Sequence, residues 1–96
     1  MSPNNKKKLI KLRKSLDRLD NSFIKLIKKR TELVKQVLKL KETKSQIIDR
    51  KRISFILGQI RKKSIKNKID PKITNRIWKN MIYSYIDYEK RNFKKK

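Results

Sequence analysis

Two cations stand out in this sequence because they share a helical face with apolar residues. Arg30 and Lys41 are eleven residues apart, and at about 100° per residue they point within about 20° of the same direction, alongside Val34 and Val37. Cations placed in this way could form a binding site for an anionic ligand. Their long stems could also lie along the apolar face and carry the charges into water.

The composition narrows the chemistry that such a site could perform. The 96 residues include 31 Lys and Arg, 8 Asp and Glu, no His and no Cys, for a formal charge of +23. These absences exclude disulfides, zinc sites built from Cys and His, and an imidazole base. There is no glycine-rich phosphate loop, and we expect neither a metal nor a cofactor. The charge predicts an acidic ligand, although the heavy use of Lys, Ile and Asn also fits compositional drift.

Apolar residues at steps of three and four predict an all-helical chain, with helices over about 9–42, 49–67 and 71–93. The first helix would be a rod of about 50 Å, far longer than the roughly 26 Å diameter of a compact domain of this length. A second chain could cover the apolar face of this rod. The sequence therefore predicts a single helical domain, 1–96, that assembles with a copy of itself.

Local signals mark where the shorter helices begin. Asp49 and the pair Asp70-Pro71 are typical of helix starts. Gly58, inside the second helix, suggests a close helix crossing, although compositional drift would explain it equally well. The basic ends of the chain are expected to be solvated and frayed. No secretory or membrane segment is visible, so we expect a cytoplasmic protein.

The order and spacing of these features resemble the all-helical class of chorismate mutase, type II. The resemblance covers roughly residues 12–89. It rests on Leu12-Arg13 with Asp17 and Asp20, Lys29-Arg30-Thr31-Glu32-Leu33, Val37 with Lys41, Ile47-Ile48-Asp49-Arg50-Lys51-Arg52, Ile69-Asp70-Pro71, and the helix from Ile77-Trp78 to Glu89.

The resemblance implies an entwined homodimer that rearranges chorismate, a dicarboxylate, to prephenate on the route to phenylalanine and tyrosine. This pericyclic reaction gains from holding the substrate in its reactive conformation and from cations near the ether oxygen, where negative charge develops. By resemblance, Arg13 crosses to the partner's site, while Arg30 and Lys41 bind the carboxylates. Lys41 also reaches the ether oxygen, and Arg52 lines the basic pocket.

The chain departs from the family pattern at three positions. Ile53 stands where members usually have a Glu that binds the ring hydroxyl of the substrate, and an Ile side chain cannot do this. Asp49 could still help at that point through its backbone. On the last helix, Tyr85 stands where Ser is common and Glu89 where many members have Gln. Only a protonated Glu89 can donate a hydrogen bond to the ether oxygen, so we expect activity to decline as pH rises.

Other functions fit parts of the pattern. Related folds act as isochorismate pyruvate lyases with a similar cationic pocket. A nucleic-acid-binding protein would explain the charge directly, and aromatic residues near the last helix could stack on bases. A basic amphipathic helix on an acidic membrane is a further alternative, but the bundle needs the apolar face.

Overall fold

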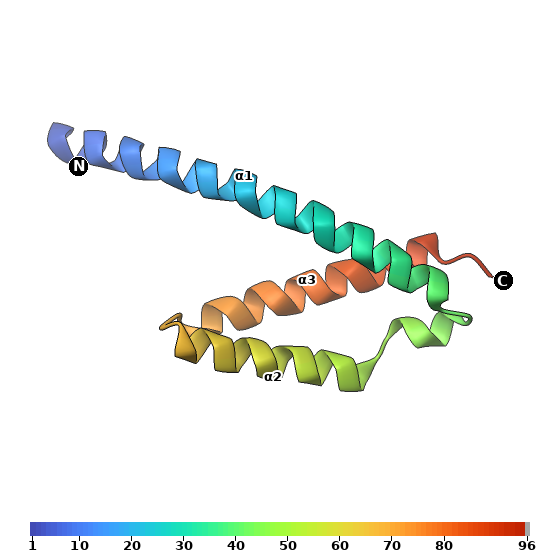
Figure 1. Cartoon of the computed structure of the whole chain (residues 1–96). Helices are drawn as coiled ribbons and strands as arrows, with labels where there is room; N and C mark the ends of the chain where they lie inside the picture. The colour runs from blue at the N-terminus through green and yellow to red at the C-terminus, as the bar shows by residue number, and fades with distance from the viewer. Residues whose placement is uncertain (96) are drawn as a thin grey trace. The chain divides into compact units, whose positions relative to one another are not determined.

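The structure, a computed structural model, describes residues 1–95 and is built from helices (Figure 1). The elements are α1 (Pro3–Leu40), the short 3₁₀ helix η1 (Lys44–Ile47), α2 (Arg50–Lys66) and α3 (Pro71–Asn92). No strand occurs in the described part of the chain. The prediction of an all-helical chain with three main helices is therefore confirmed. The chain divides into two compact units, residues 1–33 and 34–96, which we describe separately.

The first unit consists of the greater part of α1. Pro3 is the first helical residue, where its missing N–H costs no hydrogen bond, and the Ser2 hydroxyl accepts a bond from the Asn5 N–H at 3.2 Å. The helix therefore begins six residues before the predicted Leu9 and takes in the lysines that we expected to be frayed, because Lys is a good helix former. No residue of α1 is buried. Its exposed apolar residues in this unit include Leu12, Leu16, Leu19, Phe23, Ile24 and Ile27.

The second unit is held together by a small aliphatic core. Ile47, Ile82 and Ile86 are buried, and they come from η1 and α3. The half-buried residues packed against them are Leu38, Ile53, Ile56, Leu57 and Phe93. In Figure 1, α2 and α3 lie side by side and are joined by the turn at 67–70. This core brings η1 against the C-terminal half of α3.

Both predicted helix starts are confirmed. The Asp49 carboxylate accepts a hydrogen bond from the Arg52 N–H at 3.0 Å, and Asp70 accepts one from the Lys72 N–H at 2.9 Å. Each cap satisfies an N–H that has no partner within its helix, which is worth about 1 kcal/mol. Between the two caps, the buried Ser64 hydroxyl of α2 bonds to the Thr74 hydroxyl of α3 at 2.6 Å. The pair ties α2 to α3 near the turn.

The expected close helix crossing at Gly58 is wrong. A Cβ atom built at this glycine would meet no atom within 4 Å. The residue lies in α2 with no positive φ, so no backbone conformation requires glycine there.

We expect Gly58→Ala to stabilise the chain by about 1 kcal/mol, because alanine loses less backbone freedom on helix formation. Urea unfolding followed by circular dichroism measures the change. Ser54→Ala, at an exposed position one turn earlier in α2, is the matched control for an added helix former. A destabilised Gly58→Ala variant would contradict the open surroundings that the structure gives this residue.

Within residues 1–95, none of the helices is both long enough and apolar enough to cross a membrane.

Candidate active site

A buried carboxylate on α3 meets a lysine that directly follows α1. The Lys41 Nζ atom lies 3.2 Å from Oε2 and 3.4 Å from Oε1 of Glu89, which is 48 residues away in sequence. The same ammonium group donates to the Ile47 carbonyl at 3.5 Å. Glu89 is only 6% exposed. Lys41 therefore connects the end of α1, η1 and α3 at one point.

The Lys41 ammonium group compensates for the burial of the Glu89 carboxylate. Removing a carboxylate from water costs several kcal/mol unless a cation and hydrogen bonds compensate for the lost hydration. Both carboxylate oxygens of Glu89 receive such a bond from Lys41. The Lys41 side chain is 18% exposed.

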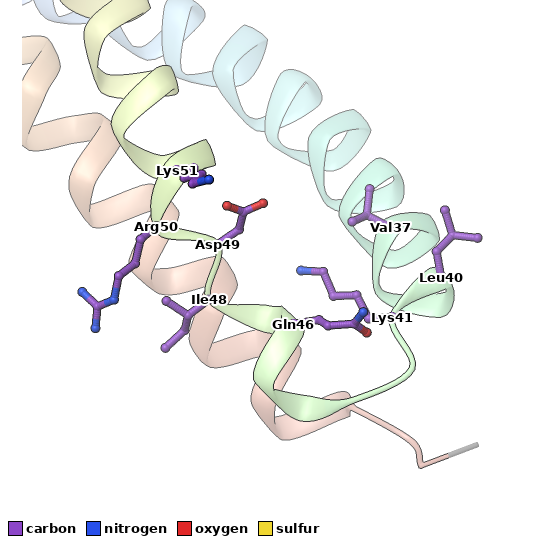
Figure 2. A pocket seen from close by; sticks show the side chains of 8 residues that line it. All are labelled: Val37, Leu40, Lys41, Gln46, Ile48, Asp49, Arg50 and Lys51. Atoms are coloured by element: carbon purple, nitrogen blue, oxygen red, sulfur yellow. The ribbon is translucent and has the colours of Figure 1, made fainter.

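Lys41 also lines an open pocket of about 590 Å³ at the start of α2 (Figure 2). The pocket is formed by Val37, Leu40, Lys41, Gln46, Ile48, Asp49, Arg50 and Lys51. Its lining includes Lys41, Arg50 and Lys51 with the Asp49 carboxylate, although Figure 2 shows the Arg50 guanidinium directed away from Lys41 and Asp49. Ammonium and guanidinium groups are good partners for carboxylate ligands. The pocket is therefore suited to a small anion.

Of the predicted site residues in the second unit, some line this pocket and others do not. Asp49 lines the pocket together with Lys41. Arg52 does not line it, and its guanidinium instead lies over the Phe55 ring, 5.4 Å from the ring centre. Tyr85 is half-buried on α3, one turn before Glu89.

Ile53 belongs to the core of the second unit. Its side chain packs against the buried isoleucines and does not line the pocket. A carboxylate at this position would lie against an aliphatic core.

The other two predicted residues belong to the first unit. Arg13 is exposed on α1 and Arg30 is half-buried, seventeen residues further along the same helix. At about 100° per residue, their side chains leave the helix about 100° apart. The two arginines therefore point to different sides of α1.

Gln46 is a pocket residue that the sequence reasoning missed. It lies between the predicted helices 9–42 and 49–67, where the sequence predicts a loop, and the structure shows it within η1. Its Oε1 atom accepts bonds from the Glu42 and Thr43 N–H groups, at 2.6 and 3.0 Å. The spacing Thr43-x-x-Gln46 is typical of a capping box and could have revealed this role.

The fold and the pocket define an all-helical protein with a pocket whose lining includes Lys41, Arg50 and Lys51. The sequence model of the family described as chorismate mutase type II matches residues 12–90. The chorismate mutase of Methanocaldococcus jannaschii is 34% identical over 76 residues, which cover 78% of this chain and 77% of that protein. The comparison with solved structures found no match. The chain belongs to the chorismate mutase type II family.

This membership decides between the functions that the sequence left open. Both matches are to chorismate mutases, so neither a nucleic-acid-binding protein nor an isochorismate pyruvate lyase is favoured.

Proposed function

We propose that this chain catalyses the rearrangement of chorismate to prephenate. The contact between Lys41 and Glu89 is the observation that carries the proposal. Lys41 lines the pocket, and the contact places the carboxyl group of Glu89, distant in sequence, next to this lysine. These are the two groups that the family resemblance assigns to the ether oxygen of the substrate.

The reaction requires positioning and charge stabilisation, and the chain offers groups for both. One carbon–oxygen bond breaks as a carbon–carbon bond forms, and negative charge grows on the ether oxygen. Lys41 stabilises that charge, and Glu89 in its protonated form donates a second hydrogen bond to the oxygen. Arg30 and Lys41 bind the substrate's carboxylates, which holds the flexible ends in the reactive conformation.

Three further residues complete the proposed site. Asp49 lines the pocket at the N-terminus of α2, and Tyr85 lies on the same face of α3 as Glu89. Arg52 joins the site when its guanidinium leaves the Phe55 ring for the bound dianion, since both side chains are exposed. The enzyme is proposed to act in the cytoplasm.

The direct test is prephenate formation from chorismate by the purified protein. We expect turnover that Arg30→Ala reduces by about 10²-fold or more, because a bidentate carboxylate contact is lost. Isochorismate is the control substrate, and release of pyruvate from it without any turnover of chorismate would refute the proposal.

We further propose that the active form is an entwined homodimer in which Arg13 completes the partner's site. Supporting this, the first unit leaves seven large apolar residues of α1 from Leu12 to Ile27 between 46% and 65% exposed. A second chain would remove this surface from water, at about 25 cal/mol for each Å² buried. The core of the second unit contains only three buried apolar residues, so burial in a dimer would add substantially to stability.

Mixing two inactive variants tests whether Arg13 acts across the dimer. Arg13→Ala and Arg30→Ala chains are unfolded, mixed in equal amounts and refolded together. In a mixed dimer, one site has its own Arg30 and receives Arg13 from the other chain, whereas the second site lacks both. Since half of the dimers are mixed, we expect about one quarter of wild-type activity.

The control is each variant refolded alone at the same total concentration, with the native mass measured for all samples. Recovery in the mixture beyond the sum of the separate samples requires that the two arginines come from different chains. No recovery from mixed dimers would show that Arg13 serves its own chain, and a monomeric, active wild type would exclude the shared site.

A further inference from the structure

A second pocket, of about 470 Å³, lies between the last turns of α1 and the C-terminal end of α3. We call it the C-terminal pocket, and its lining consists of four lysines, an asparagine, a leucine and a tyrosine. Its volume falls within the range of about 300 to 1,000 Å³ that is usual for small-molecule sites. At about 100° per residue, its Lys35 leaves α1 about 160° away from Val37, which lines the pocket that contains Lys41. The two pockets therefore lie on different sides of α1.

The apolar part of the C-terminal pocket consists of Leu38 and Tyr88. Leu38 is half-buried and packs against the core of the second unit, so its position on α1 is supported from below. Tyr88 is half-buried on α3, and the Arg91 guanidinium lies over its ring, 5.9 Å from the ring centre. Arg91 itself does not line the pocket and pairs with Asp87 at 2.8 Å. An aromatic ring beside an aliphatic side chain suits a flat apolar group.

The charged part of the C-terminal pocket is cationic. Lys35 and Lys39 come from α1, and Lys94 and Lys95 come from the segment after α3. This segment starts at Phe93, which packs against the core and so holds the two lysines near the pocket. Among the described residues that line the pocket there is no Asp or Glu. The ammonium groups repel one another, and a ligand with several negative charges would offset this repulsion.

We propose that the C-terminal pocket binds a nucleoside polyphosphate, with the base against Leu38 and Tyr88 and the phosphates among the four lysines. Bases stack on aromatic side chains, and lysine is a common phosphate ligand. The Asn92 Nδ2 atom donates to the Tyr88 carbonyl at 2.8 Å, so the Asn92 amide oxygen is the atom that can accept from an amino group of the base. An amino acid fits less well, because the pocket lining has no carboxylate for its ammonium group. The inference does not depend on the proposed function.

The charge of the site is tested by calorimetric titration of the full chain with ATP. The titration is made in about 0.15 M salt, which screens distant surface charges. We expect Lys35→Gln/Lys94→Gln to weaken ATP binding about tenfold, because two charge-assisted contacts to phosphate are lost. Lys62→Gln/Lys66→Gln is the matched control, since it removes two charges from exposed positions of α2 that line neither pocket. Equal weakening in the two double variants would overturn the proposal, because only the net charge would then matter.

The ring contact is tested by two substitutions of Tyr88. We expect Tyr88→Leu to weaken ATP binding about tenfold, because stacking with the base is lost, and Tyr88→Phe to bind ATP as the wild type does. Inorganic tripolyphosphate has no base, so its binding should be weaker than that of ATP and should be the same in all three proteins. Tripolyphosphate that binds as tightly as ATP would overturn the proposal, and so would equal ATP binding by the Leu and Phe variants.

The location of the site is tested on the opposite side of α1. Arg50→Gln/Lys51→Gln removes two exposed cations from the pocket that contains Lys41, and we expect it to leave ATP binding unchanged. A tenfold loss in this variant would place the nucleotide in the candidate active site and overturn the proposal. None of these measurements uses turnover of chorismate, so failure of this site and failure of the proposed function are separate results.

Discussion

Lys41→Met is expected to lower kcat by about 10³-fold, the largest effect of any single substitution in this chain. The reason is that Lys41 supplies the charge facing the ether oxygen, and loss of one such donor typically costs 10²-fold to 10³-fold in kcat, about 3 to 4 kcal/mol. Steady-state kinetics with chorismate measure the effect. Methionine has a similar length to lysine, so the apolar contacts of the stem are largely preserved.

The same substitution also leaves the buried Glu89 without its ion-pair partner. We therefore expect Lys41→Met to destabilise the fold by about 3 kcal/mol, measured by urea unfolding. The double variant Lys41→Met/Glu89→Gln separates the two effects, because a neutral amide is less costly to bury than an unpaired carboxylate. It should recover most of the stability but none of the activity. Activity within tenfold of wild type in either variant would remove Lys41 from the mechanism.

Glu89→Gln is expected to raise activity at alkaline pH and to flatten the pH profile. In the free chain the Glu89 carboxylate is paired with Lys41, and an ionised carboxylate cannot donate to the ether oxygen. Wild-type kcat should therefore depend on pH. An amide donates at every pH and leaves Lys41 free for the substrate. Measuring kcat of both enzymes from mildly acidic to mildly alkaline pH gives the pH at which their two profiles cross.

Asp87→Asn is the matched control, because it removes one negative charge from an exposed position on the same helix. Its profile should follow that of the wild type. Glu89→Ala should be poorly active at all pH values, since it offers no donor. A wild-type profile that is already flat, or full activity in Glu89→Ala, would contradict the role of Glu89.

Much of the fold could be predicted from the sequence because local rules decide it. The caps at Asp49 and Asp70 satisfy orphan N–H groups within the first turn of each helix, so no distant residue is needed to recognise them. The first helix was predicted to begin too late in the chain, because Ser2 and Pro3 were not recognised as a start signal. Gly58 was misinterpreted because a glycine shows that a close approach is possible, not that one occurs.

The candidate site, too, could be predicted from the sequence only where a local signal marks the residue. Lys41 was found from helical spacing, and Glu89 only from the family resemblance, because a 48-residue separation has no local signature. The side-chain position of Arg52 over Phe55 depends on a ring one turn away, which the motif does not encode. Gln46 escaped notice because its importance comes from two backbone N–H groups rather than from its residue type.

The hydroxyl pair between Ser64 and Thr74 has a consequence for the distant Lys41–Glu89 contact. Helices that pack only through isoleucines can slide along each other, since one aliphatic side chain can replace another at little cost. A shift would break the hydrogen bond between the two hydroxyls, at a cost of about 1 kcal/mol, although each hydroxyl keeps a backbone carbonyl on its own helix, Ile60 for Ser64 and Pro71 for Thr74. A one-residue slip of α3 would move Glu89 by about 1.5 Å and turn it about 100° away from Lys41. The pair thus favours one register of α3, in which the proposed catalytic carboxyl group lies beside Lys41.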